Sequence, residues 1–161
     1  MIPDSLLRDA ESLLEECRAR GRKIVTAESC TGGLIAATLT AVPGASDVLE
    51  RGFVTYSNAA KNECLGVKLA LIAARGAVSE DVARAMAEGA LARSPADIAV
   101  AVTGITGPGG GSADKPVGLV CFGLARRGEL ARGESRTFPG DRAVIRAAVV
   151  AHVFTLIRAA L

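Results

Sequence analysis

The sequence is poor in the features on which nucleic-acid binding depends. Its 161 residues include no Trp, one Tyr and four Phe, and the net charge is only +2. Single-stranded nucleic acids stack their bases on aromatic side chains and are held by clustered positive charge. Because the basic residues are spread along the chain and aromatic platforms are missing, the composition argues against a nucleic-acid-binding protein.

Histidine and closely spaced cysteines are scarce as well. The chain has one histidine, His152, and four cysteines at positions 17, 30, 64 and 121 with no Cys-x-x-Cys spacing. Zinc sites use closely spaced Cys and His ligands, and disulfide frameworks use characteristic cysteine spacings, so we predict reduced thiols and no metal. His152 falls in the middle of a helical pattern, which indicates a packing role and argues against a Ser-His-Asp triad.

No long hydrophobic run is present, and no charged and then apolar leader opens the sequence. The most apolar stretch, 147–161, is interrupted by His152 and Arg158. A membrane-spanning helix needs about 20 consecutive apolar residues. We therefore expect a cytoplasmic protein that does not associate with a membrane.

Residue periodicity predicts a single α/β domain over residues 1–161. Strands that alternate with helices, followed by a hairpin at 127–129, predict a three-layer α/β/α fold with a mixed sheet. A breaker at 42–45 is expected to lead into a helical turn ending near Arg51, and Asn58 and Ser79 are expected to cap helices. The predicted helices are 4–20, 31–41, 58–64, 69–75, 79–93 and 141 onward, and the predicted strands are 23–28, 53–56, 97–102, 117–125 and 130–138.

The segment 26–33 (TAESCTGG) joins a short apolar strand to a helix through a glycine turn. A helix N-terminus offers unpaired N–H groups and the positive end of the helix dipole, which together stabilise an oxyanion. Ser29 is therefore a candidate nucleophile. Cys30 is its rival because thiols ionise more readily in this setting. The two side chains should point in opposite directions, so only one can face a pocket.

A nucleophilic serine needs a base, and the lysines are the remaining candidates. Lys23 opens the first strand, whereas Lys61 lies in the predicted helix 58–64. A lysine base near neutral pH needs its pKa lowered by about 3 units, or ~4 kcal/mol, and a helix N-terminus adds only up to ~2 kcal/mol of influence. Lys61 must therefore be buried, although spacing alone favours a solvated helix lysine. Tyr56 could orient the base or relay a proton, and it fits an exposed tyrosine at the sheet edge equally well.

A second glycine-rich segment, 102–112 (VTGITGPGGGS), follows a predicted strand, where ligands of α/β sheets bind. It lacks the Gly-Lys-Ser/Thr of a Walker P-loop, but its N–H groups and the hydroxyls of Thr103 and Thr106 suit a phosphate or an amide oxygen. A plain surface loop is the alternative. Arg142 opens the last helix against its dipole, which an anionic ligand or an ion pair with Asp141 would explain.

Five segments, in this order, closely resemble the CinA C-terminal domain family, and the likeness spans nearly the whole chain. Any one segment would be weak support, whereas all five together are specific. They are 27–33 (AESCTGG), 56–61 (YSNAAK), 76–79 (GAVS), 102–110 (VTGITGPGG) and 139–142 (PGDR).

The resemblance implies nicotinamide-nucleotide amidase activity, in which the carboxamide of nicotinamide mononucleotide is hydrolysed to nicotinate mononucleotide and ammonia in pyridine nucleotide salvage. It implies that no metal or cofactor is used, and relatives suggest a homodimer. Many relatives carry a further N-terminal domain, so this chain resembles the stand-alone form. The family name derives from competence and DNA damage, which leaves a non-catalytic interaction module as the alternative. An amidase for another small amide is a third possibility.

The resemblance also implies roles for individual residues. Ser29 would be the nucleophile and Lys61 the general base, with Tyr56 and Thr103 supporting catalysis. The oxyanion would be held by N–H groups of 30–32, and the phosphate or ribose by the glycine-rich loop and an arginine. The substrate-binding residues expected from this match are Cys30, Thr31, Gly32, Gly104, Thr106, Gly107 and Arg142.

Overall fold

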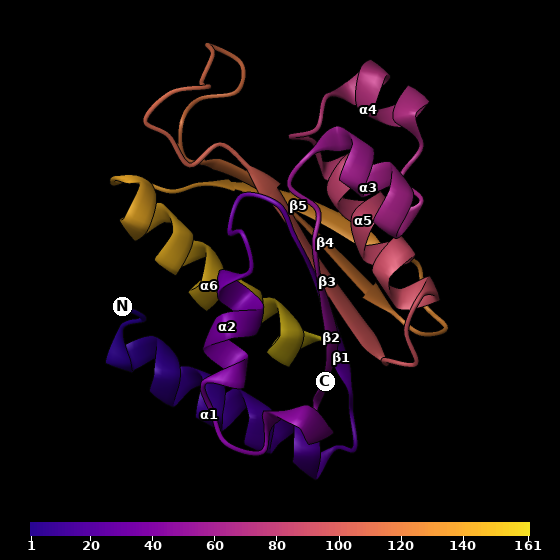
Figure 1. Ribbon diagram of the computed structural model, residues 1–161, viewed down its shortest axis with the longest axis vertical. Helices are drawn as coiled ribbons and strands as arrows, with labels where there is room; N and C mark the ends of the chain where they lie inside the picture. Colours follow the sequence, from indigo (N-terminus) through magenta and orange to yellow (C-terminus); the bar gives the residue numbers. More distant parts are fainter.

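The computed structural model describes all 161 residues as one mixed five-stranded sheet flanked by helices, in the strand order β2-β1-β3-β4-β5 (Figure 1). This is the single-domain, three-layer α/β/α fold that the periodicity predicts. The elements are α1 (Asp4–Ala19), β1 (Ile24–Glu28), α2 (Leu34–Thr40), β2 (Leu49–Val54), α3 (Asn58–Leu65), α4 (Leu69–Arg75), α5 (Glu80–Ala92), β3 (Ile98–Gly104), β4 (Leu119–Arg126), β5 (Arg132–Thr137) and α6 (Arg142–Ala159), with a short 3₁₀ turn at Ala45–Asp47.

The sheet is parallel on one side and antiparallel on the other. β1 pairs in parallel with β2 and β3, whereas β4 runs antiparallel to β3 and β5, so the predicted hairpin is confirmed. Glu28, the last residue of β1, pairs with Val54 in β2 and Val102 in β3. The carboxyl ends of three strands therefore meet at one edge of the sheet, which is where ligands bind in open α/β folds.

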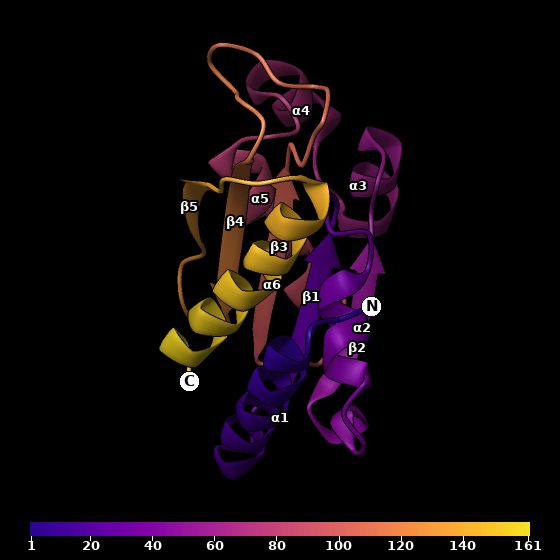
Figure 2. The same ribbon diagram turned by 90° about the vertical axis from the view of Figure 1, so that its left-hand side faces the viewer.

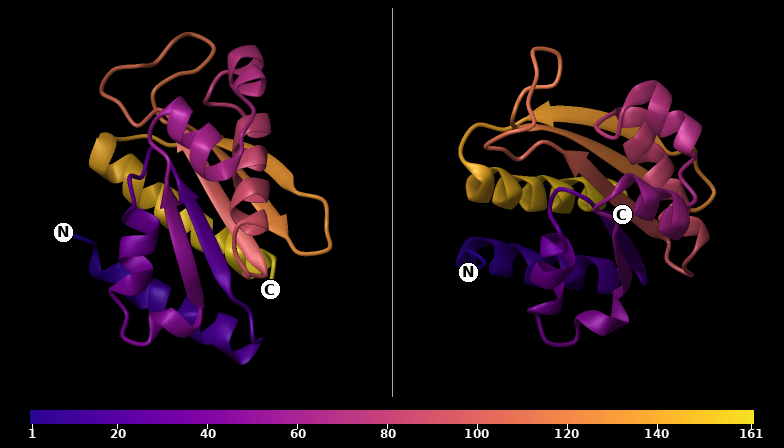
Figure 3. Two further views of the ribbon diagram at one scale, coloured as in Figure 1. Left: turned by 45° about the vertical axis from the view of Figure 1, so that its right-hand side comes forward. Right: turned by 45° about the horizontal axis from the view of Figure 1, so that its top comes forward.

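Helices cover both faces of the sheet. Helices α1, α2 and α6 lie on one face, and α3, α4 and α5 lie on the other (Figures 2 and 3). The aliphatic core is correspondingly divided into a larger cluster of 24 buried residues under α1 and α6 and a smaller cluster of 13 under α5. None of the helices is both long enough and apolar enough to cross a membrane.

Two glycines let α5 approach its neighbours at backbone contact. A Cβ atom at Gly123 in β4 would lie 2.0 Å from the carbonyl oxygen of Ala83 in α5. A Cβ atom at Gly89 in α5 would lie 1.9 Å from the carbonyl oxygen of Leu65, the last residue of α3. Both distances are far below van der Waals contact, so α5 and α3 hold their places only because these side chains are absent.

Three local predictions were wrong. Arg51 lies in edge strand β2, which spans Leu49–Val54, and the helical turn before it is limited to Ala45–Asp47. Ser57 caps α3 in place of Asn58, with its Oγ accepting a hydrogen bond from the Ala60 N–H at 3.0 Å. Helix α2 begins only at Leu34, because Gly32 and Gly33 have φ values of 59° and 98° that no right-handed helix accommodates.

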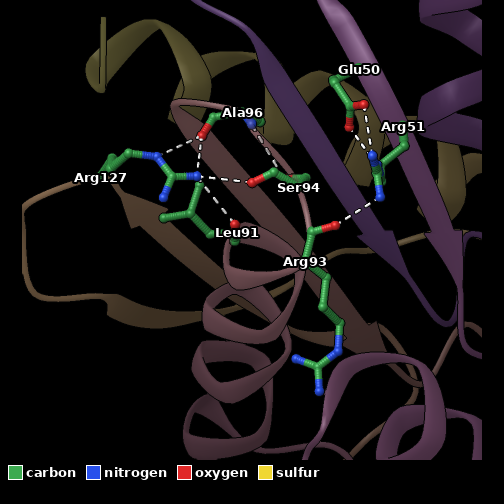
Figure 4. A network of polar contacts seen from close by, with 7 residues as sticks. All are labelled: Glu50, Arg51, Leu91, Arg93, Ser94, Ala96 and Arg127. Carbon is green, nitrogen blue, oxygen red and sulfur yellow. Dashed lines mark hydrogen bonds and ion pairs between the residues drawn. The ribbon is translucent and has the colours of Figure 1, made fainter.

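At the end of the sheet opposite to the carboxyl end of β1, arginine side chains donate hydrogen bonds to backbone carbonyl oxygens (Figure 4). The guanidinium of Arg127 donates to the carbonyl oxygens of Leu91, Ser94 and Ala96 at 2.7–3.2 Å, and Arg51 donates to that of Arg93 at 2.8 Å. These carbonyls end α5 and lead into β3, where positive charge is favoured by the helix dipole. We call these contacts the Arg127 network.

Candidate active site

Ser29 stands at the carboxyl end of β1, at the start of the glycine turn. Its N–H donates to the carbonyl oxygen of Val102 at 3.0 Å, and its carbonyl oxygen accepts from the Gly32 N–H at 3.0 Å. Its side chain is largely buried but lines a pocket. The backbone around the hydroxyl is thus fixed from both sides.

The Lys61 amine lies next to this hydroxyl. Its Nζ is 2.9 Å from Ser29 Oγ and 3.0 Å from the carbonyl oxygen of Thr55, and the residue is only 2% exposed. No carboxylate pairs with the amine. Burial therefore lowers the pKa of Lys61 below its ordinary value, and the neighbouring Cys30 sulfur opposes that shift only in part. The solvated helix lysine that spacing alone favours is excluded.

Cys30 points into the larger core cluster and does not compete as a nucleophile. Burial raises the pKa of its thiol to about 12, and the nearby Glu28 carboxylate adds to this effect. A thiol in this environment stays protonated at neutral pH. The backbone of this turn remains available to a ligand, because the N–H groups of Cys30 and Thr31 donate to no acceptor in the protein.

The expectation that the α2 N-terminus holds an oxyanion was wrong, because a protein carboxylate already occupies it. Glu28 is fully buried, and its oxygens accept from the N–H groups of Gly33, Ile35 and Ala36 at 2.9–3.1 Å. They also accept from Thr31 Oγ1 at 2.6 Å. The free N–H groups near Ser29 are those of Cys30 and Thr31 in the turn, whereas the Gly32 N–H donates to the Ser29 carbonyl oxygen.

Arg142 and Tyr56 meet at the rim of the pocket. Arg142 Nη2 donates to the Tyr56 hydroxyl at 3.0 Å, and Nη1 donates to Thr106 Oγ1 and to the Gly107 carbonyl oxygen, each at 2.9 Å. The ion pair with Asp141 is not formed, since that carboxylate caps α6 through the Val144 N–H. Tyr56 is 62% exposed at the mouth of the pocket.

The pocket has a volume of about 260 Å³ and no acidic side chain in its lining. Backbone N–H groups at 106, 107 and 109–111 donate to no acceptor in the protein, so the glycine-rich loop presents donors with no assigned partner. A wall of this kind suits an anionic or carbonyl oxygen. The lining residues are Ser29, Cys30, Tyr56, Gly104, Ile105, Thr106, Gly107, Gly109, Gly110 and Arg142.

Three of the predicted site residues lie outside the pocket lining. Thr103 is 2% exposed, and its hydroxyl donates to the carbonyl oxygen of Ala77 at 2.9 Å, which ties β3 to the segment before α5. Thr31 holds Glu28, and Gly32 supplies the turn. The structure therefore gives Thr103, Thr31 and Gly32 supporting positions, without a place in the pocket lining.

Sequence reasoning missed three contributors. Glu28 carried a signal, namely a carboxylate that ends an otherwise buried strand. Thr55 acts through its carbonyl oxygen, which no sequence pattern reveals. Arg146 in α6 donates from Nη2 to the Thr31 carbonyl oxygen at 2.6 Å, and it is distant in sequence from the turn it holds.

The single histidine lies outside this pocket. His152 Nε2 contacts Glu134 Oε1 at 2.5 Å, and the ring packs edge-on against Phe122 with centroids 4.7 Å apart. The packing role expected for His152 is confirmed. No group of three or more His, Cys, Asp and Glu side chains gathers anywhere in the structure, and the absence of a metal and of a cofactor stays a prediction.

Comparisons with known proteins agree with the fold. The crystal structure of the competence/damage inducible protein CihA from Agrobacterium tumefaciens matches with a TM-score of 0.94 and 45% identity over 99% of this chain and 97% of that one. The ComA structure from Klebsiella pneumoniae matches with a TM-score of 0.90 and 36% identity over 94% of each chain. A CinA-like protein of Mycolicibacterium paratuberculosis is 55% identical over 150 residues, which are 89% of this chain and 35% of that protein.

The chain spans about a third of the length of the curated relatives it matches. The family model described as the CinA C-terminal domain matches residues 8–161. That match covers α1 from Arg8 onward and every later element of the fold, including all the pocket residues. The chain belongs to the CinA C-terminal domain family.

Proposed function

We propose that the chain is an amidase that hydrolyses nicotinamide mononucleotide to nicotinate mononucleotide and ammonia, with Ser29 as the nucleophile and Lys61 as the general base. One observation carries the proposal: the Lys61 amine is 2.9 Å from Ser29 Oγ, buried and without a carboxylate partner. An amine held in this way loses its proton more easily than an exposed one, and a neutral amine can accept the serine proton.

The first half of the reaction forms an acyl-enzyme. Ser29 Oγ attacks the carboxamide carbon while its proton passes to the neutral Lys61 amine. The N–H groups of Cys30 and Thr31, which have no protein acceptor, would receive the oxyanion of the tetrahedral intermediate. The Lys61 ammonium, kept in place by the Thr55 carbonyl oxygen, then gives a proton to the leaving nitrogen as the C–N bond breaks and ammonia departs.

The second half reverses these proton transfers. The neutral Lys61 amine takes a proton from water, which attacks the ester carbon. The same amine then returns a proton to Ser29 Oγ as the C–O bond breaks. The product acid releases its proton to solvent and leaves as a carboxylate, and the enzyme is restored with Lys61 neutral.

The mononucleotide is proposed as substrate because the family resemblance implies it and the pocket suits an anion. Arg142 supplies positive charge at the rim, and the N–H groups of 106–111 supply unused donors. The lining carries no carboxylate that would repel a phosphate. The homodimeric state and the cytoplasmic location stay predictions alongside this substrate.

The test is release of ammonia from the mononucleotide by the wild-type protein and by Ser29→Ala and Lys61→Met. Loss of either group should reduce turnover by a factor on the order of 10²–10⁴, since each variant removes a participant in proton transfer or covalent catalysis. Lys68→Met is the matched control, because Lys68 is an exposed lysine outside the pocket.

Nicotinamide and its riboside should be compared with the mononucleotide in the same assay. A higher kcat/KM for the mononucleotide supports recognition of the phosphate, and equal values would point to a different small amide. Absence of ammonia from all three amides, together with a partner protein whose binding Ser29→Ala alters, would contradict the amidase and favour a non-catalytic interaction module.

A further inference from the structure

The Glu28 carboxylate is buried without a cationic partner. The residue has 0% exposure, and no arginine, lysine or histidine side chain contacts its oxygens. A buried carboxylate is unfavourable unless hydrogen bonds compensate for the lost water. Four donors do so here, three of them N–H groups from the first turn of α2 and its N-cap position.

The cap that Glu28 provides comes from an unusual position. The N-cap residue of α2 is Gly33, which has no side chain to offer, and the capping carboxylate lies five residues earlier in the sequence. The chain between them folds back through two left-handed glycines so that α2 rests on the end of β1. Ser29 is the first residue of this folded-back segment, and its position therefore depends on the contact that Glu28 makes.

The backbone of Glu28 reaches the other half of the proposed catalytic pair. Its carbonyl oxygen accepts from the Thr55 N–H at 2.8 Å, and the Thr55 carbonyl oxygen in turn accepts from Lys61 Nζ at 3.0 Å. Glu28 thus lies between the segment that carries the hydroxyl and the residue that holds the amine. The N–H groups of Cys30 and Thr31 meanwhile remain without an acceptor.

We propose that Glu28 is a positioning residue for the nucleophile: its carboxylate takes up the donors of the α2 N-terminus and thereby sets the turn in which Ser29 and the free N–H groups of Cys30 and Thr31 converge. The inference deepens the proposed function, since it rests on Ser29 as the nucleophile. It does not depend on which amide is the substrate.

The decisive variant is Glu28→Gln. Glutamine has the size of glutamate but replaces one acceptor oxygen with an NH₂ group, which would face N–H groups that need an acceptor. Reactivity of Ser29 is measured with a fluorophosphonate probe, and intact-mass spectrometry gives the labelling rate across pH. We expect the plateau rate of the folded variant to fall at least tenfold, with the pH midpoint unchanged because the surroundings of Lys61 are unchanged.

Thr31 offers a milder pair of variants if Glu28→Gln does not fold. Thr31→Val removes the hydroxyl that donates to Glu28, and Thr31→Ser keeps it. Labelling should slow in the valine variant and recover in the serine variant. Ser79→Ala is the control, because Ser79 caps α5 through the Val82 N–H and lies outside the pocket. It should lower the melting temperature while the labelling rate stays unchanged.

The outcomes separate this inference from the proposed function. Folded Glu28→Gln that is labelled within twofold of wild type would overturn the positioning role, even if the wild type hydrolyses the mononucleotide. A wild type that is labelled at Ser29 but releases no ammonia would contradict the proposed function, and a slowed Glu28→Gln would still support the positioning role. A wild type that is not labelled at Ser29 would contradict both. A shifted pH midpoint in Glu28→Gln would overturn the positioning role as well, since it would show that Glu28 acts on the protonation of Lys61.

Discussion

The two ends of the central sheet handle polar groups in opposite ways. At the end that carries the Arg127 network, guanidinium groups donate to backbone carbonyl oxygens, and those of Ser94 and Ala96 have no other donor. At the end that carries the pocket, an amine is buried without a counter-ion, and backbone N–H groups point to no protein acceptor. At the first end the protein itself supplies donors to these carbonyl oxygens, and at the second the donors are left without acceptors.

The difference separates stability from chemistry. Fully paired polar groups hold α5 and β3 together, whereas unpaired ones tend to mark functional sites because a ligand or a transition state completes them. Substitutions at the two ends should therefore divide cleanly into those that affect turnover and those that affect unfolding.

The pH dependence of turnover should show the largest effect at the pocket end. Burial lowers the pKa of Lys61, so activity should rise with pH through a midpoint below 10.5 and then level off. Below that midpoint the rate should fall about tenfold per pH unit, because protonated amine cannot accept the serine proton. The pH–rate profile measures this, and a rate that depends only on a group titrating near pH 4 would contradict a lysine base.

The same shift predicts how stability varies with pH. An unfolded lysine keeps its proton up to about pH 10.4, whereas the buried amine releases its proton at lower pH. Between the two values the unfolded state binds more protons, so the free energy of unfolding should rise with pH in this window. Lys61→Met should lack this rise, which urea unfolding at several pH values can test against Lys68→Met.

Arg142→Met should have an intermediate effect, on KM for the mononucleotide, and the exposed Arg132 serves as its comparison. A charge-assisted hydrogen bond is worth about 1.5–3 kcal/mol, so KM for the mononucleotide should rise roughly 10- to 100-fold. The riboside should be affected much less, since it carries no phosphate. Arg132→Met is the control, because Arg132 is exposed on the far edge strand β5. Equal losses for both substrates would break the assignment of Arg142 to the anion.

Arg127→Met should leave turnover unchanged and affect unfolding alone. The carbonyl oxygens of Ser94 and Ala96 lose their donor, while that of Leu91 keeps the Ser94 N–H, and we expect the free energy of unfolding to fall by about 1–3 kcal/mol. Urea unfolding and the ammonia assay on the same preparation measure both quantities. A loss of kcat in the folded variant would show that the two ends are coupled and would break the comparison.

Much of this arrangement was predictable from local patterns. The strand, turn and helix around Ser29 were evident because apolar residues stop where two glycines follow. Lys61 was a candidate base whose spacing alone favoured a solvated position, and only the packing of α3 shows that it is buried, since burial depends on partners distant in sequence. The charge of Arg142, placed against a helix dipole, is a local signal that made it a candidate, and the structure places it in the pocket lining.

The remaining features depend on tertiary contacts that have no local signal. Glu28 caps a helix from the preceding strand, so the usual rule of a Ser, Thr, Asp or Asn at the N-cap does not find it. Strand β2 was misplaced because an edge strand is half solvated and its apolar pattern is weak. Thr103 was placed in the pocket because a hydroxyl in a glycine-rich segment does not reveal which way it faces.

The backbone contact at Gly89 in α5 limits which substitutions the active protein can accept there. The end of α3 rests directly on that glycine, and α3 carries the lysine that contacts Ser29. Even one added methyl would push α3 outward and draw the amine from its alcohol, while most of the hydrophobic interior would remain intact. A random-mutagenesis screen that selects well-expressed but inactive proteins should therefore recover Gly89 variants, although Gly89 lies outside the pocket.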